Sequence, residues 1–286
     1  MTARLPCRRS QRGVALLVVL WACTLLAIML GGYAMLARTE GLQARFQFAQ
    51  TQAHYAAEAG LARAIYGLQD PQLAQRWLSD GRPYTFRFDA AKVQVSAVDE
   101  GGKVDLNSAS PIVLQGLFRA AGQRPDTAQK LAAAVVDWRE FDIGRKVGLD
   151  VYTASGYKPR HAPFLSIEEV QQVAGMTPAL YRAIAGAITI WSGRESPDPN
   201  TATPLALAAI PGMTPERVAQ VLAARHNTRP GVAGLFAGNG VTHSIRSEAT
   251  MADGTRAVLQ ATVRLQGVRP GAQPYAVLHW REGDRE

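Results

Sequence analysis

Cysteine is almost absent from this chain of 286 residues. Only two occur, Cys7 close to the N-terminus and Cys23 inside an uncharged apolar run. Beyond residue 23 there is no thiol, which excludes a disulfide and a cysteine nucleophile from that part of the chain. The absence fits any cellular compartment, because it removes only one way of stabilising a fold.

The residue sets of catalytic and metal sites are missing as well. Zinc sites need ligands at short, fixed spacings, whereas the five histidines stand far apart in the sequence, at His54, His161, His226, His243 and His279. The sequence contains neither a glycine-rich phosphate loop nor a nucleophile elbow. We therefore expect a protein that is not an enzyme and that requires no cofactor.

Acidic residues are missing from the first 13 positions, which carry four arginines: Arg4, Arg8, Arg9 and Arg12. The whole chain has a formal charge of +8, but without these positions 27 basic residues stand against 23 acidic ones, a charge of +4. A surplus this small is not the concentrated basic surface of a nucleic-acid-binding protein.

Charge is also missing from Val14 to Ala37, a run of 24 residues. A helix of roughly 20 apolar residues crosses the hydrocarbon core of a bilayer. The arginines before the run predict a cytoplasmic N-terminus, with everything after Arg38 on the far side of the membrane. The run is longer than the apolar part of a cleavable signal peptide, and no small-x-small cleavage site follows it.

The junction Arg12-Gly13-Val14, where the basic leader meets the apolar run, resembles the class III leader of prepilins. The resemblance implies that prepilin peptidase cleaves after Gly13 on the cytoplasmic side. Val14 would then be the new N-terminus and a position for N-methylation. A plain, uncleaved signal anchor is the alternative interpretation of the same residues.

Pilins usually carry glutamate at the fifth mature position, which here is Val18. A carboxylate among packed apolar helices is costly unless an opposite charge compensates it. In pilins that charge is assigned to the terminal amine of the subunit above. A subunit at the tip has no such neighbour, so the valine favours a tip-like class over a minor pilin of a type IV pilus.

The helix is predicted to continue after the apolar run. Small and apolar residues recur at steps of three or four with polar residues between them, at Leu42, Phe46, Ala49, Ala53, Ala56, Gly60, Ala64 and Leu68. Asp70-Pro71 predicts the end of this helix. Residues 54–61 (HYAAEAGL) also resemble the spine sequence of pseudopilins.

Alternating apolar and polar residues predict strands in two separate parts of the chain. The first part holds Tyr84, Phe86 and Phe88, then Val93, Val95 and Ala97; the second holds Val241, His243 and Ile245, then residues 257–265 and 275–281. Strands on both sides of a helical stretch predict an α+β protein in which one antiparallel sheet is interrupted by an inserted all-helical domain.

The stretch between the strands has helical periodicity. A first helix is predicted to start at Asn107 or Ser108, with an apolar stripe at Val113, Leu114, Leu117 and Phe118. Ser166 and Glu169 have the spacing of a capping box. Further helices are predicted over residues 126–139, 166–174, 178–190, 204–209 and 215–225.

These patterns divide the chain into five parts. We expect a leader over residues 1–13, a membrane-spanning helix over 14–37, and a periplasmic helix with the first strands over 38–102. The helical insertion is expected over 103–200, and a helical pair with the closing strands over 201–286.

Several segments, taken in this order, resemble the K-type minor pseudopilins of type II secretion systems (the GspK family). They are Val104-Asp105-Leu106-Asn107, Val136-Asp137-Trp138-Arg139, residues 162–169 (APFLSIEE), Gly175-Met176-Thr177, Asn200-Thr201-Ala202 and Trp280-Arg281-Glu282. The resemblance covers nearly the whole chain. It implies a pilin-like fold, with a long N-terminal transmembrane helix packed on an antiparallel sheet and a large helical insertion.

The same resemblance implies a function in protein export across the outer membrane. Such a subunit forms or caps the tip of the pseudopilus and helps to initiate its assembly. The implied partners are the I-type and J-type minor pseudopilins, prepilin peptidase, the inner-membrane secretion platform, and secreted substrate or the outer-membrane secretin, but no nucleic acid. The chain would cross the bacterial inner membrane once, with its C-terminal part in the periplasm.

Two helix-hairpin-helix patterns support a rival interpretation, a membrane-anchored DNA-binding protein of a competence system. One runs from Val170 to Thr177 and the other from Leu207 to Thr214. DNA-binding hairpins typically use Gly-x-Gly, so that backbone amides can approach a phosphate. Here Thr177 and Thr214 replace the second glycine and no lysine cluster follows, which favours hairpins that serve only packing.

Calcium is the one ion that the resemblance implies, since K-type pseudopilins carry it in the helical domain. Candidate ligands are the carboxylates around Trp138, namely Asp137, Glu140, Asp142 and Asp150. Calcium prefers several oxygen ligands from an acid-rich loop. Because Arg139, Arg145, Lys146 and Lys158 lie in the same stretch, a charge-balanced loop without metal is the alternative.

Overall fold

The structure is a computed structural model that describes residues 12–141, 159–227, 241–266 and 273–283. Two compact units divide the chain, Met1–Gln52 and Ala53–Glu286. Asp142 and Asp150, two of the carboxylates named above, lie outside the described residues.

Helix α1 (Arg12–Leu68) begins in the first unit and ends in the second. Within the first unit its apolar side chains are exposed all around the helix, for example Leu16, Leu20 and Met29, at 76%, 65% and 73%. In the described part of the chain, α1 is the single helix that is long and apolar enough to span a membrane. The helix ends two residues before Asp70-Pro71, as predicted.

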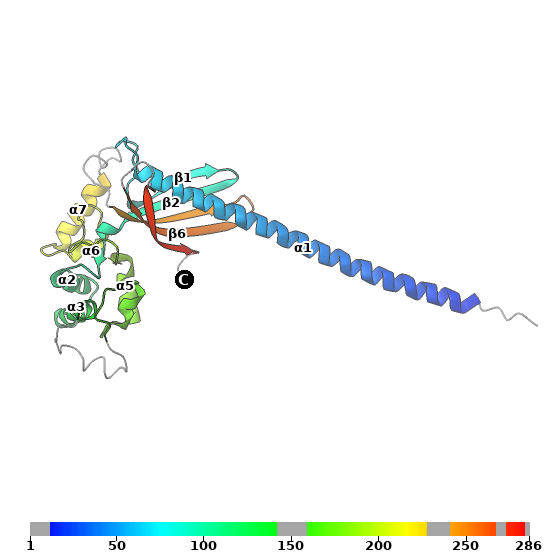
Figure 1. Cartoon of the computed structure of the whole chain (residues 1–286), viewed down its shortest axis with the longest axis horizontal. Helices are drawn as coiled ribbons and strands as arrows, with labels where there is room; N and C mark the ends of the chain where they lie inside the picture. The colour runs from blue at the N-terminus through cyan, green and yellow to red at the C-terminus, as the bar shows by residue number, and fades with distance from the viewer. Residues whose placement is uncertain (1–11, 142–158, 228–240, 267–272, 284–286) are drawn as a thin grey trace, which may run out of the picture. The chain divides into compact units, whose positions relative to one another are not determined.

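The last four turns of α1 pack on a sheet in the second unit (Figure 1). The buried face is made of small and branched residues at helical spacing: Ala53, Ala56, Ala57, Leu61, Ala64, Ile65 and Leu68. Gly60 lies at the closest approach, since a Cβ there would fall 2.2 Å from Ser247 Oγ and 2.7 Å from Val93 Cγ1. A glycine at this position lets the helix axis lie closer to the sheet than any side chain would allow.

The sheet has five antiparallel strands in the order β1-β2-β5-β6-β7. They are β1 (Asp80–Phe88), β2 (Ala91–Asp99), β5 (Thr242–Thr250), β6 (Arg256–Leu265) and β7 (Tyr275–Glu282). The predicted alternation is confirmed, because Val93, Val95 and Ala97 are all buried beneath α1. Asp89, at φ 50°, makes the tight β1–β2 turn.

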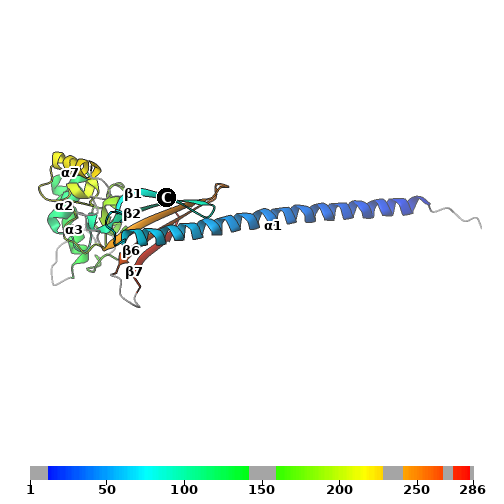
Figure 2. The same cartoon turned by 90° about the horizontal axis from the view of Figure 1, so that it is seen from above.

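The segment between β2 and β5 carries the remaining elements, gathered at one end of the sheet (Figures 1 and 2). It contains η1 (Glu100–Gly102), β3 (Val104–Asp105), α2 (Pro111–Ala120), α3 (Pro125–Arg139), η2 (Glu168–Gln172), α5 (Pro178–Ile184), η3 (Ala185–Ala187), β4 (Ile188–Thr189), α6 (Pro204–Ala208) and α7 (Pro215–Asn227). The predicted stripe of α2 is confirmed, since Val113, Leu114, Leu117 and Phe118 are buried.

Two separate hydrophobic cores lie in the second unit. One joins α1 to the sheet, and the other joins the elements between β2 and β5. The second core includes Ala206 and Leu207 of α6 together with Leu114 and Leu117 of α2. The boundary predicted after residue 200 therefore does not coincide with a boundary between cores.

The periodicity predicted an all-helical segment, but the structure also contains strands there. Val104–Asp105 and Ile188–Thr189 pair as a short parallel ladder, which ties the start of the segment to the residues that follow η3. A two-residue strand shows no alternation, so the sequence pattern could not reveal it.

Two predicted helix starts differ from the structure. Helix α2 is preceded by Ser110 rather than by Asn107 or Ser108, because the side chain of Asn107 bonds elsewhere. The helix predicted over 166–174 is only the 3-10 turn η2, and Glu169 accepts a hydrogen bond from Leu165 N instead of closing a capping box with Ser166. The helix predicted over 178–190 ends at Ile184.

Candidate functional site

The part of helix α1 that lies in the first unit has the properties of a membrane anchor. Its threonine hydroxyls bond inside the helix, with Thr24 donating to Trp21 O at 2.8 Å and Thr39 to Met35 O at 3.0 Å. No charged residue lies between Val14 and Ala37. Such a surface is stable only in lipid or against other apolar helices, because exposed apolar area is unfavourable in water.

The predicted processing site lies in the first turn of α1. Gly13 directly follows Arg12, where the helix begins, and Val14 is 70% exposed. Val18, at the fifth mature position, is 60% exposed on the same helix. Gly31 and Gly32 have no other atom within 4 Å of the position a Cβ would take, so both lie on an open surface.

A network of buried polar groups holds the segment between β2 and β5 together, and it starts at Asp105. This carboxylate is 1% exposed. Its Oδ1 accepts hydrogen bonds from Asn107 N and Ser108 N, and its Oδ2 accepts from Gly193 N at 2.8 Å and Ser192 Oγ at 3.1 Å. A buried carboxylate that accepts from four donors fixes the two chain segments that meet there.

Asn107 makes the next connection, to Phe164. Its Oδ1 accepts from Phe164 N at 2.7 Å, and its Nδ2 donates to Phe164 O at 3.1 Å. The Phe164 ring is buried and stacks on Trp138, with ring centroids 6.2 Å apart. Both backbone polar groups of a buried residue are therefore satisfied by one side chain.

Arg139, at the end of α3, completes the network. Its guanidinium donates to Leu106 O at 2.8 Å and to Ala109 O at 2.7 Å. Burial lowers the pKa of Arg139, and the nearby carboxylates of Glu140 and Asp105 offset only part of this effect. An arginine remains charged under these conditions, so it satisfies two carbonyls that have no helix or strand partner.

Glu169 links η2 to α3 and to the chain before it. Its carboxylate accepts from Trp138 Nε1 at 3.1 Å, from Arg160 at 3.1 Å and from Leu165 N at 2.8 Å. Burial opposes its ionisation, but the hydrogen bonds from Leu165, Arg160 and Trp138 outweigh this and lower its pKa. Asp105, Asn107 and Glu169 lie in segments that resemble the K-type pseudopilins, whereas Arg160, Ser192 and Gly193 do not. The contacts among all of them could be found only in three dimensions.

Both helix-hairpin-helix patterns are confirmed as short hairpins. Their glycines, Gly175 and Gly212, adopt φ of +83° and +78°. The threonines that replace the second glycine accept hydrogen bonds from the following helix, Thr177 Oγ1 from Leu180 N and Thr214 Oγ1 from Arg217 N. The first position of each following helix is a proline, which has no N–H. At each helix start one amide is thus bonded to the threonine and the first position has none, which leaves fewer amides for a phosphate.

Two of the four predicted calcium ligands can be placed. Asp137 lies in the last turn of α3, where its carbonyl contacts His161 Nδ1 at 3.0 Å, and Glu140 directly follows the helix. Among the residues that the structure describes, no group of three or more His, Cys, Asp or Glu side chains is placed to hold a metal ion. Carboxylate oxygens are nonetheless the ligand type that calcium prefers.

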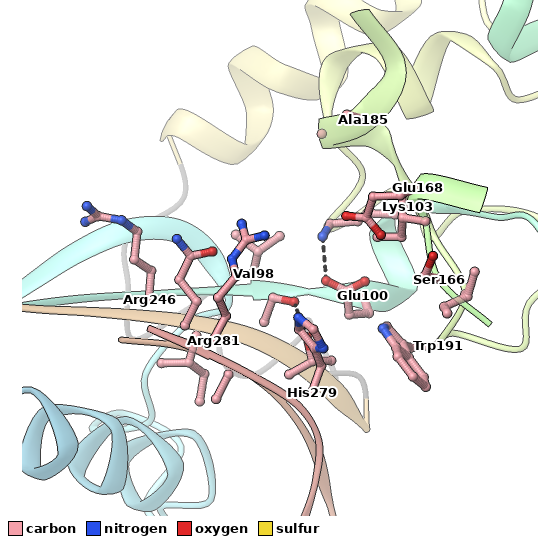
Figure 3. A pocket seen from close by; sticks show the side chains of 18 of the residues that line it. Val98, Glu100, Lys103, Ser166, Glu168, Ala185, Trp191, Arg246, His279 and Arg281 are labelled. Atoms are coloured by element: carbon pink, nitrogen blue, oxygen red, sulfur yellow. Dashed lines mark hydrogen bonds and ion pairs between the residues drawn. The ribbon is translucent and has the colours of Figure 1, made fainter. Parts of the chain in front are cut away.

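A cleft of about 420 Å³ lies between the sheet and the helical segment (Figure 3). Arg246 and Arg281 rise from the sheet on one side, and Ser166 and Glu168 from the other. Glu100, whose side chain is 1% exposed, forms an ion pair in the cleft lining with Lys103, with 2.5 Å between Oε1 and Nζ. Sequence reasoning missed this cleft, since its lining comes from four strands of the sheet and from several separate segments between β2 and β5.

An apolar N-terminal helix that continues onto a five-stranded antiparallel sheet is the arrangement that the resemblance to pseudopilins predicts. The sequence profile of the family "Type II secretion system (T2SS), protein K" matches residues 91–193. The matched region comprises 103 of the 286 residues, so the chain is similar to this family over that region. The family is a structural component of secretion and not an enzyme family.

Two relatives illustrate the match. The chain is 30% identical over 201 residues to the type II secretion system protein K of Klebsiella pneumoniae, and it spans 61% of that protein's length. The fold is similar to a chain in the crystal structure of the GspK-GspI-GspJ complex from enterotoxigenic Escherichia coli. That similarity has a TM-score of 0.58 at 18% identity and covers 85% of this chain and 100% of the other.

Proposed function

We propose that this chain is the minor pseudopilin that forms the tip of a type II secretion pseudopilus and helps to start its assembly. The observation that carries the proposal is a single helix with two surfaces. The part of α1 in the first unit exposes apolar side chains all around, while the last four turns of the helix are buried against the sheet. One subunit can thus bundle with others through the apolar part and present a folded domain to the periplasm.

Processing by prepilin peptidase is part of the proposal. Cleavage after Gly13 would remove four arginines and leave Val14 as the first residue. The removed charges favour a cytoplasmic N-terminus before cleavage, so the sheet and helical segment would lie in the periplasm. The helix would remain in the inner membrane, available to the secretion platform.

The proposed partners are the I-type and J-type minor pseudopilins, in line with the complex in which the similar Escherichia coli chain was crystallised. Helices associate in lipid through close van der Waals packing, which small residues permit. Gly31, Gly32 and Ala34 form such a stretch, and the open surface at both glycines supports a contact there.

The capping role rests on the segment between β2 and β5. We interpret residues 103–227 as one inserted domain, because α2, α3, α5, α6 and α7 share a core that is separate from the core beneath α1. Its bulk at one end of the sheet would obstruct a subunit added above it and would be the part nearest to secreted substrate or the outer-membrane secretin. Val18 fits the same role, since it supplies no carboxylate for a subunit above.

Co-purification tests the proposal directly. The full chain, expressed with the I-type and J-type pseudopilins and extracted in mild detergent, should be recovered in one complex with both. Replacing Gly31 and Gly32 by leucine should weaken recovery, whereas Gly41→Leu, on the same helix outside the apolar run, should leave it unchanged. Recovery without either partner, or equal loss in both variants, would contradict the proposed assembly.

Calcium binding remains a proposal of its own. The carboxylates of Asp137 and Glu140 would supply hard oxygen ligands at the end of α3, together with Asp142 and Asp150. Equilibrium dialysis of the full chain against radioactive calcium would detect the site. Loss of binding in Asp137→Asn together with Glu140→Gln, and retention in Asp126→Asn at the other end of α3, would support it.

A further inference from the structure

One face of the sheet is covered by α1, and the opposite face forms a wall of the cleft. Four residues lie in register across that wall, Ser96 on β2, Arg246 on β5, Gln260 on β6 and Arg281 on β7. All four line the cleft. Because neighbouring strands are about 4.8 Å apart, the two arginines start from points about 10 Å apart on one surface.

Within the described part of the chain, Arg281 has a buried donor without an acceptor. Its Nη2 is inaccessible to water and makes no hydrogen bond among the residues that the structure describes. Gln260, its neighbour in register, donates its side-chain amide to Gly283 O instead. A guanidinium has five N–H donors, and leaving one of them buried and unsatisfied is unfavourable. Such an orphaned donor indicates a place for an anionic acceptor.

The other charges of the cleft are largely matched. Lys103 pairs with Glu100. Arg246 pairs with Glu248, which does not line the cleft and also contacts Arg256, at 2.8 and 2.5 Å. The sheet wall therefore has more guanidinium than carboxylate, whereas Glu168 on the opposite wall is exposed to solvent. Trp191 and Ile190 supply apolar surface between the two walls.

We propose that this cleft binds an extended, acidic peptide segment of a partner protein, with one carboxylate on Arg281 and the chain crossing toward Trp191. A carboxylate matches the planar fork of an arginine in two parallel hydrogen bonds. The apolar residues would contact the peptide between its acidic groups. The site is a property of the folded periplasmic unit and is independent of the position of the chain in a pseudopilus.

Fluorescence anisotropy tests the site with the full chain in detergent. The probe is a labelled hexapeptide of alternating serine and glutamate, and the control peptide has glutamine in place of glutamate. Arg281→Gln should weaken binding of the glutamate peptide about ten-fold, the loss expected for one charge-assisted hydrogen-bond pair. Arg217→Gln removes an exposed charge of the same kind on α7 and should leave binding unchanged.

A second variant keeps the test informative if Arg281→Gln does not fold. Ser96→Glu places a carboxylate in the same row as the arginines and should compete with the peptide from within the protein. Equal binding of both peptides, equal effects of the Arg281 and Arg217 variants, or no binding at millimolar peptide would overturn the proposal. Binding of phosphatidylglycerol nanodiscs in place of the peptide, lost in Arg281→Gln, would assign the cleft to lipid and overturn it as well.

Discussion

Asn107 and Phe164 are bonded like neighbours in a β-ladder, although 57 positions separate them. The asparagine amide accepts from Phe164 N and donates to Phe164 O, at 2.7 and 3.1 Å. One side chain thereby fixes the lead-in to α2 against the segment that precedes η2. The link explains why an asparagine stands where the sequence pattern predicted a helix cap.

Replacing Asn107 by alanine should lower the free energy of unfolding by roughly 2–4 kcal/mol, because two buried backbone groups lose their partners. Urea titration of the full chain in detergent would measure the change. Asn200→Ala removes an exposed asparagine side chain and serves as the control. Similar midpoints for both variants would show that the pair contributes little.

The carboxylate of Glu169 predicts a pH dependence in acid. Its pKa is lowered in the folded protein, so its contribution to stability is fully present above the ordinary glutamate pKa of about 4.3. The contribution is lost as the pH falls through the lower, folded value. Glu169→Gln should therefore flatten the decline of the thermal midpoint between about pH 5 and 3. Glu168→Gln, at the exposed neighbour, should leave the slope as it is.

Gly60 should tolerate no side chain. Alanine would place its Cβ 2.2 Å from Ser247 Oγ, so α1 and β5 would have to separate. We expect a loss of about 1–3 kcal/mol, typical of an overpacked core. Gly41→Ala lies on the same helix with no atom near its added methyl group and should be neutral or slightly stabilising. An equal response of both variants in thermal unfolding would contradict the close approach.

Thr177 separates the packing role of the hairpins from DNA binding. Thr177→Gly restores the Gly-x-Gly pattern but removes the acceptor of Leu180 N–H. The variant should lose up to about 1 kcal/mol of stability and gain no affinity for duplex DNA. Thr177→Ser keeps the hydroxyl acceptor, so it should keep the original stability and also gain no affinity for DNA. Salt-dependent binding of DNA by Thr177→Gly, measured by gel shift, would favour the competence-system interpretation instead.

Much of the fold could be predicted from residue periodicity. The helix up to Leu68, the alternation in β2 and the buried stripe of α2 follow from local patterns, which the sequence displays directly. The contacts between distant parts of the chain could not be predicted in this way. Glu169 has the spacing of a capping box, yet its carboxylate is taken by Trp138, Arg160 and Leu165.

The candidate site could be predicted only in part, because its residues are brought together from distant positions in the chain. Asp105, Asn107 and Trp138 lie in segments that the sequence singled out, but their partners are up to 88 positions away. Arg281 lay in a matching segment without any assigned role, since its orphaned Nη2 depends on how β7 is placed beside β6. Long-range pairing of this kind leaves no periodic signal in a single sequence.

The mass of the N-terminal peptide from the protein isolated from cells tests the central claim most directly. A chain that is processed as a pseudopilin should begin at Val14, carry one added methyl group on its amine, and retain the whole apolar run to Ala37. A chain that still begins at Met1, or one that has been cut after the apolar run, would contradict the account.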